Sequence, residues 1–406
     1  MSANRTSPKK RNTGLTLGGF VLLLVIAAVY FFFPSKNPLT TPTQLPTTPV
    51  QIPTTPTQLS ATQSPTGQAG SQTDWLQVYF TNPNPPDNVG NGIDQYVVAD
   101  VGQAKNSIDV TSFDLNLPSF VNALVAASQN GVKVRVVVDE VNGSQKLAAS
   151  ESPTGQDFDA VQTLNAAGIT VVDGGRSSGL MHDKMIIIDG KILYMGSWNM
   201  SYTDTFRNNN NLLRITDPTL IANYQAKFNE LFVDKRFGTH AQVGSQTPRM
   251  TIGGVQVENY FSPVDNVMDK LVSYVQGAQT SIRFMIFTYT DVDLANAMIA
   301  PYQAGVDTQG VIENRGASNG AMVPLFCAKV PVKLDGNKYT MHHKIIVIDG
   351  SVVITGSFNF TVSADKENDD NVLVIHNADL AKLYLQEFDR VWGLATDPDP
   401  AKITCK

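Results

Sequence analysis

Short runs of β-branched and aliphatic residues alternate with helical stretches along this chain from residue 75 onward. The helical stretches include residues 120–129 and 292–303, and the short runs between such stretches are typical of strands. The alternation of strands with helices predicts an α/β fold with a largely parallel sheet. A hydrophobic content of 42% in 406 residues is enough for a substantial core.

Landmarks of the first half of this region reappear in the second half in the same order. Residues 78–83 resemble 259–263, 106–113 resemble 280–287, and 130–139 resemble 304–313. We therefore expect two tandem lobes of one fold, at residues 75–245 and 246–396. The offset between copies falls from 181 to 174 and then to 160, which indicates extra loop residues at 84–92 and 142–157. Together with residues 314–323, we expect these loops to shape the entrance of a site.

The N-terminal part has a different composition. Residues 14–33 are uncharged and rich in Leu, Val, Ile and Phe, which is the length and composition of a transmembrane helix. The preceding tail, residues 1–13, carries four basic residues and no acidic one, so we expect a single-pass anchor in the cell membrane with the remaining chain outside the cytoplasm. A cleaved signal peptide is the alternative, but the apolar run ends in Phe-Phe-Phe-Pro and not at a small-x-small site.

Residues 34–74 are dominated by Pro, Thr, Gln and Ser and contain Thr-Pro-Thr-Gln-Leu twice. Such a segment cannot bury enough apolar surface to fold, so it predicts a disordered linker with an extended chain. At the other end, we expect residues 397–406 to form a C-terminal tail. The chain contains two cysteines, Cys327 and Cys405, which are too few for a disulfide framework or a zinc site. They pair with each other if the domain lies outside the cytoplasm, or Cys327 is a buried thiol and Cys405 a loose one.

Charge argues against a polyanionic partner. From residue 75 onward the chain has 25 basic and 35 acidic side chains. A negative region is poorly suited to attract a nucleic-acid backbone, although a local basic groove could override the total. Nucleic acid is therefore a less favoured substrate than lipid, but the charge does not exclude it.

Each half contains an apolar run that is broken by an Asp-Gly pair, and each run predicts a β-hairpin with this pair at its turn. In an extended chain, residues two apart share a face, so His182 and Lys184 point to the same side, as do His342 and Lys344. A buried strand does not carry an ionisable pair on one face unless the charge has a partner. The arrangement therefore indicates a site.

The polar positions around the two hairpins have identical spacing. They are His182, Lys184, Asp189, Ser197 and Asn199 in the first copy and His342, Lys344, Asp349, Ser357 and Asn359 in the second. A single copy has an ordinary explanation, namely a hydrogen-bonded strand histidine, a lysine with a buried stem and an aspartate in a turn. The repetition of the whole pattern is not explained in this way.

These residues resemble the mark of the phospholipase D superfamily, which is His-x-Lys followed at fixed distance by Asp and then by Gly-Ser-x-Asn. The resemblance covers residues 75–392. It implies two phospholipase D-like α/β/α lobes that pack as a pseudo-dimer within a monomeric chain, with both motifs at one active site. It also implies a reaction that uses no metal or other cofactor.

Phosphodiester hydrolysis needs a nucleophile, an acid for the departing oxygen, and donors that hold the anionic oxygens. Two histidines can divide the first two tasks through a phosphohistidine. The two lysines supply the electrostatic stabilisation that a metal ion supplies elsewhere. We expect Ser197, Asn199, Ser357 and Asn359 to bind the phosphate, with Asp189 and Asp349 included in the catalytic group.

The two halves differ at one position. Members of the resembled family often place an acid after Gly-Ser-x-Asn that hydrogen-bonds the histidine of the same motif, and Asp370 fits that place in the second half, whereas the first half has Asn210. Because a carboxylate raises the pKa of an imidazole more than an amide does, we expect His342 to hold a proton and act as the acid, and His182 to be the nucleophile. The alternative is that residues 208–211 form a plain loop and that Asp204 serves His182.

The leading functional prediction is a phospholipase D-type phosphodiesterase that hydrolyses phospholipids to phosphatidic acid and a free head group, held at its membrane substrate by the anchor. A phosphatidyltransferase like cardiolipin synthase is the second reading, and a metal-independent surface endonuclease the third. A binding module that has lost catalysis would have degenerate motifs, and both copies here are intact.

Overall fold

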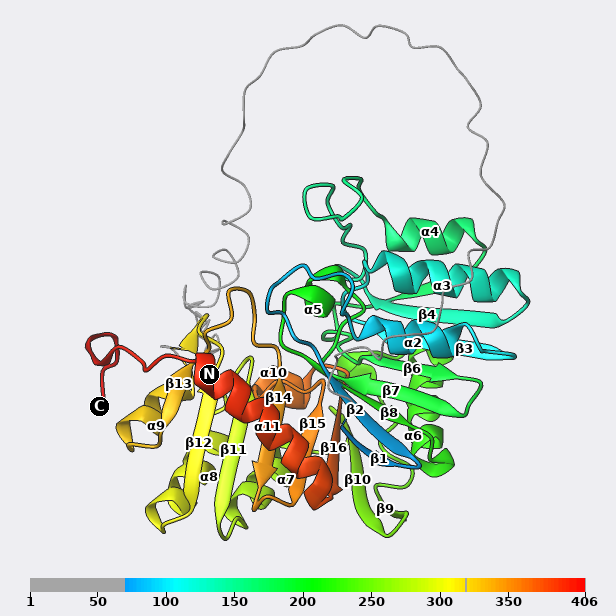
Figure 1. Cartoon of the computed structure of the whole chain (residues 1–406). Helices are drawn as coiled ribbons and strands as arrows, with labels where there is room; N and C mark the ends of the chain where they lie inside the picture. The colour runs from blue at the N-terminus through cyan, green and yellow to red at the C-terminus, as the bar shows by residue number, and fades with distance from the viewer. Residues whose placement is uncertain (1–69, 318–319, 406) are drawn as a thin grey trace, which may run out of the picture. The chain divides into compact units, whose positions relative to one another are not determined.

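The computed structural model of the chain describes residues 70–317 and 320–405 (Figure 1). The segment expected to span the membrane, 14–33, and the part of the predicted linker before residue 70 lie outside these residues. Residues 70–73, which were predicted to belong to the disordered linker, form a strand that pairs with residues 76–78, so the linker prediction is wrong for them. Across the described ranges, none of the helices combines the length and the apolar character that a bilayer crossing requires.

The first lobe is built on an eight-stranded sheet in the order β1-β2-β8-β7-β6-β3-β4-β5. Its strands are β1 (Gly70–Thr73), β2 (Leu76–Phe80), β3 (Ser107–Ser112), β4 (Lys133–Asp139), β5 (Thr170–Gly174), β6 (Met185–Ile188), β7 (Ile192–Gly196) and β8 (Asn211–Ile215). Only β3, β4 and β5 run parallel, and the other neighbours are antiparallel. The prediction of a largely parallel sheet is therefore wrong, because among neighbouring strands only β3 and β4, and β4 and β5, are joined through a helix of more than five residues.

The second lobe repeats this arrangement. Its sheet has the order β13-β12-β11-β14-β15-β16-β10-β9, and only β11, β12 and β13 run parallel. Its strands are β9 (Arg249–Ile252), β10 (Val255–Ser262), β11 (Ser281–Ile286), β12 (Asp307–Ile312), β13 (Val332–Leu334), β14 (Lys344–Ile348), β15 (Val352–Gly356) and β16 (Asp370–His376). The landmarks that recur in the sequence fall on equivalent strands, namely β2 with β10, β3 with β11 and β4 with β12. The prediction of two lobes with one fold is confirmed.

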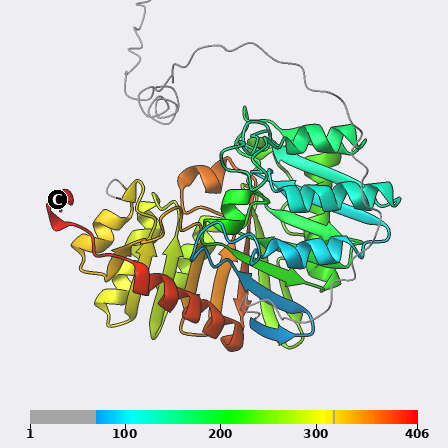
Figure 2. The same cartoon turned by 45° about the horizontal axis from the view of Figure 1, so that its top comes forward.

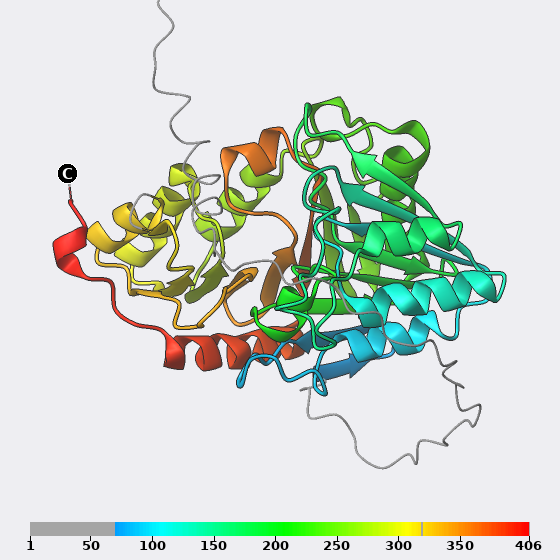
Figure 3. The same ribbon diagram turned by 90° about the horizontal axis from the view of Figure 1, so that it is seen from above.

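Helices cover the sheets (Figures 1–3). In the first lobe they are α2 (Asp94–Val101), α3 (Pro118–Gln129), α4 (Ala160–Ala166), α5 (Tyr202–Phe206) and α6 (Pro218–Asn229), followed by the π-helical turn η2 (Glu230–Asp234) and the 3-10 turn η3 (Gly238–His240). In the second lobe they are α7 (Val267–Gln276), α8 (Val292–Gln303), α9 (Met322–Cys327), α10 (Val362–Lys366) and α11 (Ala378–Leu394), followed by η5 (Pro400–Lys402). Figure 1 shows α2, α3 and α4 side by side on the first lobe, and α7 and α8 on the second.

A central apolar core joins the two lobes. It packs side chains of α6 and α11 with inward-facing residues of both sheets, including Met185 and Met195 from the first lobe and Ile345 and Val353 from the second. Each lobe has a second core under its outer helices. Because one continuous cluster contains residues from both sheets, the lobes are packed as a pseudo-dimer and hold the two motifs in a fixed relation.

Both predicted hairpins are confirmed. Strands β6 and β7 pair antiparallel around Asp189 and Gly190, as β14 and β15 do around Asp349 and Gly350. All four turn residues have φ between 52° and 63°, which is the left-handed conformation that a two-residue turn requires and that Asp-Gly adopts readily.

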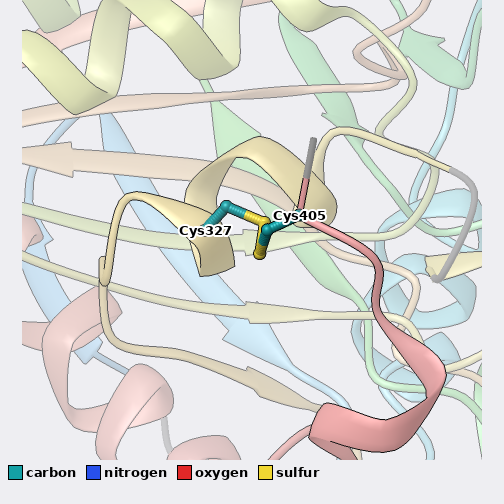
Figure 4. Close-up of a disulfide and its surroundings, with 2 residues drawn as sticks. All are labelled: Cys327 and Cys405. Atoms are coloured by element: carbon teal, nitrogen blue, oxygen red, sulfur yellow. A yellow bond between two sulfur atoms is a disulfide. The ribbon is translucent and has the colours of Figure 1, made fainter.

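The two cysteines form a disulfide (Figure 4). Cys327 lies at the end of α9 and Cys405 in the C-terminal tail, with 5.6 Å between their Cα atoms. Of the two possibilities that the sequence left open, the structure contains the pair, which fastens the tail to the second lobe.

Candidate active site

The two motif segments are joined across the lobe interface by backbone hydrogen bonds. The backbone N–H of His182 donates to the carbonyl oxygen of Asp369 at 2.9 Å, and that of His342 donates to the carbonyl oxygen of Asn209 at 2.9 Å. The His-x-Lys segment of each lobe thus runs beside the segment that follows Gly-Ser-x-Asn in the other lobe. This crossing decides which side chain meets which histidine.

His182 is held by the carboxylate of Asp370. Its Nδ1 lies 2.6 Å from Asp370 Oδ1, which also accepts a hydrogen bond from Ser357 Oγ at 2.6 Å. The prediction that Asp370 serves His342 is therefore wrong, because the segment containing Asp370 crosses to the histidine of the opposite lobe. Asp370 and Ser357 are both fully buried.

His342 is held by an amide. Its Nδ1 lies 2.9 Å from Asn210 Oδ1, which accepts a second hydrogen bond from Ser197 Oγ at 2.9 Å. The nearest carboxylate is Asp204, whose Oδ2 lies 3.6 Å from the same Nδ1. The expectation that Asn210 or Asp204 faces His182 is corrected by the same crossing. Ser197 and Ser357, which we expected to bind phosphate, instead donate to the side chains that orient the histidines.

The glycine of each Gly-Ser pair is required by a close backbone contact. A Cβ at Gly196 would lie 2.3 Å from the carbonyl oxygen of Asn211, and one at Gly356 would lie 2.1 Å from that of Asn371. These contacts seat the serines beside Asn210 and Asp370, because the backbone N–H groups of Ser197 and Ser357 donate to the same two carbonyl oxygens. Any larger residue would displace the serines.

Of the motif asparagines, Asn199 is buried and Asn359 is half-buried. Asn199 donates from its Nδ2 to Asp204 Oδ2 at 2.6 Å, and its backbone N–H donates to that oxygen at 3.0 Å. The side-chain oxygens of Asn199 and Asn359 are both buried without a hydrogen-bond partner within the described structure. These amides remain candidates for contact with a bound group.

The ammonium group of each lysine binds the backbone of the histidine in its own motif. Lys184 Nζ donates to the carbonyl oxygen of His182 at 2.8 Å, and Lys344 Nζ donates to that of His342 at 2.8 Å. Both lysines are only 1% exposed, so their charge acts in a medium where water screens it weakly.

Two phenylalanines that the sequence analysis did not select complete the site. The ring of Phe113 lies 4.8 Å from the imidazole of His182 and 5.2 Å from Lys184 Nζ. Phe287 has the same relation to His342 and Lys344, at 4.7 Å to each. The signal was present, because both residues end the repeated landmarks 106–113 and 280–287.

The site favours an anion. Burial lowers the pKa of Lys184 to about 8 in spite of the nearby carboxylates Asp370 and Asp204, and burial with the charge of Lys184 holds the pKa of Lys344 well below its ordinary value. Burial and the two lysine charges likewise hold the pKa of His342 well below 6.5. Burial lowers the pKa of His182 too, against the opposing effect of Asp370. A negatively charged oxygen placed among these groups would relieve their mutual repulsion.

Asp189 and Asp349 do not belong to this site. The carboxylate of Asp189 accepts hydrogen bonds from the backbone N–H groups of Lys105, Asn106 and Ser107. Asp349 binds residues 279–281 in the same way. Both carboxylates sit in the hairpin turns at the end of the hairpin away from the histidines, so their inclusion in the catalytic group is corrected. They fasten the turn to the start of a neighbouring strand.

The sequence matches the family described as "Cardiolipin synthase, PLD-like domain" over residues 97–232 and 271–392, which is more than half of the chain. Each match falls in one lobe and includes one complete motif. The chain therefore belongs to the phospholipase D-like family.

The chain is also similar to curated proteins and to a solved structure. It is 36% identical over 139 residues to a mitochondrial cardiolipin hydrolase of Xenopus tropicalis, and 34% identical over 134 residues to a phospholipase D of Rickettsia prowazekii. The matches cover 34% and 32% of this chain and 65% of each relative, so the chain spans just under two thirds of their length. The structure of a phosphatidylserine synthase of Haemophilus influenzae aligns with a TM-score of 0.60 and 11% identity, over 80% of this chain and 87% of that one. This last likeness concerns the fold.

Proposed function

We propose that the protein is a phospholipase D-type enzyme that hydrolyses phospholipids to phosphatidic acid and a free head group. The observation that carries the proposal is the crossed placement of the two histidines. Each imidazole belongs to one lobe and is held by a side chain of the other, beside two buried lysines. One chain thus supplies a nucleophile, an acid and a cationic environment at one place, so a monomer is sufficient.

In the first step, Nε2 of neutral His182 attacks phosphorus. The hydrogen bond between Nδ1–H and Asp370 leaves the Nε2 lone pair free and offsets the positive charge that forms on the phosphorylated ring. The N–P bond forms as the P–O bond to the head group breaks, and the departing oxygen takes a proton from His342.

In the second step, His342 accepts a proton from water as the water oxygen bonds to phosphorus. The N–P bond then breaks, His182 returns to its neutral form, and phosphatidic acid leaves. Lys184 and Lys344 stabilise the phosphoryl oxygens in both steps. His182 remains the proposed nucleophile, but the reason differs from the one given by the sequence. Asp370 binds the nucleophile His182 and not the acid His342.

His342 must be protonated to act as the acid, although burial and the lysine charges hold its pKa well below 6.5. A substrate phosphate brings negative charge between the two lysines and thereby raises the pKa of His342. The acid therefore forms in the complex with substrate.

A lipid substrate is supported by the relatives, which are named for cardiolipin hydrolysis and phospholipase D activity. The excess of acidic over basic side chains from residue 75 onward disfavours a nucleic-acid backbone. A second candidate is phosphatidyl transfer, in which a lipid alcohol replaces water in the second step. The family description, which names cardiolipin synthase, favours this candidate.

We also propose that residues 14–33 anchor the protein in the cell membrane and that the two lobes lie outside the cytoplasm. The uncharged apolar segment behind a basic tail supports this arrangement. The disulfide between Cys327 and Cys405 supports it independently, since such bonds persist in oxidising compartments. Protease digestion of intact and of opened cells tests it, because only an external domain is cut in both.

The test of function is product analysis. The full-length chain in detergent is incubated in EDTA with mixed phospholipid vesicles, with and without ethanol, and separately with plasmid DNA. Phosphatidic acid and free head group support hydrolysis, and phosphatidylethanol in the ethanol sample supports transfer. Cleaved plasmid with intact lipid would overturn the proposal in favour of a nuclease. The matched controls are His182→Ala and His342→Ala, which should yield no product.

A further inference from the structure

The two lobes differ in how they hold the histidine that they receive from the other lobe. Asp370 of the second lobe holds His182, and the equivalent residue of the first lobe, Asn210, holds His342. One surrounding hydrogen bond is shared, since Ser357 donates to Asp370 and Ser197 donates to Asn210. His342 therefore lacks the direct carboxylate contact that His182 has.

A carboxylate is nevertheless present six residues earlier. The short helices α5 and α10 are equivalent, and each begins at a hydroxyl residue, Ser201 or Thr361, that caps the backbone N–H three residues on. That third residue is Asp204 in the first lobe and Ala364 in the second. The first lobe thus combines Asp204 with Asn210, and the second combines Ala364 with Asp370.

Asp204 is placed to act on His342. It is 3% exposed, and its Oδ2 lies 3.6 Å from His342 Nδ1. The carbonyl oxygen of Asp204 also accepts a hydrogen bond from Asn210 Nδ2 at 3.0 Å. This bond fixes which way the amide of Asn210 points, so Oδ1 faces the imidazole. His342 Nδ1 must then be the donor, which leaves Nε2 for the reaction.

Three other ionisable groups lie around Asp204. The ammonium groups of Lys184 and Lys344 interact with it. Asp114, from the loop after β3, faces it as a second carboxyl group, and burial together with the charge of Asp204 raises the pKa of Asp114 to about 7. Asp114 therefore holds its proton more readily than an ordinary aspartic acid does, which limits the repulsion between the two carboxyl groups.

We propose that Asp204 is a positioning residue that supplies to His342 the negative charge that Asp370 supplies to His182. The first lobe carries the charge at position 204, whereas the second lobe carries it at position 370. Asn210 orients the ring of His342, and Asp204 stabilises the imidazolium through space. This inference rests on the proposed function, in which His342 is the acid, and it adds a residue and an arrangement specific to the first lobe.

The test removes the carboxylate at position 204 and then introduces one at position 210. Asp204→Ala gives the first lobe the residue that the second lobe has at this place, and Asp204→Ala with Asn210→Asp puts the second-lobe residue at both positions. Asp365→Asn is the matched control. It removes a buried carboxylate from the equivalent helix α10, and this carboxylate accepts a hydrogen bond from the backbone N–H of Met268 instead of facing a histidine.

The first readout is the rate of the first turnover with two short-chain substrates, phosphatidylcholine and phosphatidyl-4-nitrophenol. An alkoxide needs a proton to leave and a nitrophenolate does not. Asp204→Ala should therefore slow the choline substrate by roughly tenfold or more and the nitrophenyl substrate far less. The double variant should restore most of the choline rate, and Asp365→Asn should preserve the wild-type ratio of the two rates. Equal losses on both substrates, or no recovery in the double variant, would overturn the proposal.

The second readout does not require turnover. The chain has five histidines, so NMR of ¹⁵N-histidine-labelled full-length protein, saturated with inorganic phosphate, can follow the titration of His342. The midpoint should fall by about one pH unit in Asp204→Ala and recover in the double variant. An unchanged midpoint of the His342 titration would refute the role of Asp204, even if the enzyme acts on another substrate. If the midpoints change as expected but the protein hydrolyses neither of the two lipid substrates, only the proposed function is refuted.

Discussion

His182 Nδ1 and Asp370 Oδ1 lie 2.6 Å apart, although 188 residues separate them and they belong to different lobes. The contact is one half of a crossed arrangement, of which the other half joins His342 to Asn210. Each lobe supplies the hydrogen-bond partner of the Nδ1 atom in the other lobe's histidine. The two lobes must therefore be packed together for the site to exist, and the central core that both share provides this packing.

Replacement of Asp370 by Asn should lower kcat by roughly 10²- to 10⁴-fold, because the amide no longer offsets the charge that forms on His182. Ser357→Ala is the milder comparison, since Ser357 only orients Asp370. Steady-state kinetics with matched melting temperatures measures both. Full activity in Asp370→Asn would show that this contact does not serve catalysis.

Asp189→Ala and Asp349→Ala should leave kcat unchanged and reduce stability by about 1–2 kcal/mol, as the loss of a capping carboxylate does. Partial burial raises the pKa of Asp189, but the backbone N–H groups of Ser107, Asn106 and Lys105 outweigh it and hold the pKa below its ordinary value. Because the folded state binds the proton less tightly, the stabilisation is complete at neutral pH and is lost as the pH falls below about 4. Urea unfolding at pH 7 and pH 3 checks this. A large loss of kcat in a stably folded variant would return these residues to the catalytic group.

Affinity for tungstate, a phosphate-like anion of constant charge at neutral and alkaline pH, should weaken as the pH rises through about 8. Burial lowers the pKa of Lys184 to about 8, so this lysine loses its positive charge in that range. Binding of the anion should raise the lysine pKa, and protons should therefore be taken up. Calorimetry in buffers of different ionisation enthalpy measures both effects. Affinity that stays constant from pH 7 to pH 9.5 would contradict the assignment of Lys184 as an anion-binding cation.

Removal of the disulfide in the double variant Cys327→Ser and Cys405→Ser should destabilise the chain by about 2–4 kcal/mol, because the bond closes a loop with a sequence separation of 78 residues. Activity at low temperature should persist, since neither cysteine contacts the site. Thermal unfolding with and without reductant is the measurement. If the variant and the wild type respond alike to reductant, the bond is not formed in the protein.

The hairpins and the repeated lobes could be predicted from sequence because their signals are local. Asp-Gly between apolar runs specifies a tight turn, and α8 begins at Val292 and ends at Gln303, where the helical stretch does. Sheet direction was mispredicted for a related reason. Alternation of strand and helix describes β3 to β5, but the strands from β6 to β8 follow one another through the hairpin and a short helix and run antiparallel.

The partners of the histidines could not be predicted, because spacing along one motif carries no information about which lobe a segment faces. Asp370 follows His342 by 28 residues, and yet the chain delivers it to His182. The serines illustrate the same limit. Gly-Ser-x-Asn marks residues near the site, but only the packing shows that Ser197 and Ser357 face other side chains.

The central claim is that both motifs act on one phosphorus atom, with His182 as the nucleophile. The most direct test is to incubate the His342→Ala variant with phosphatidyl-4-nitrophenol, whose leaving group needs no acid, and to locate the trapped phosphatidyl group by mass spectrometry at alkaline pH. We predict that the adduct accumulates on His182, because the base for the second step is missing, and that His182→Ala traps nothing. An adduct on another residue, or an adduct in His182→Ala on His342, would contradict the account.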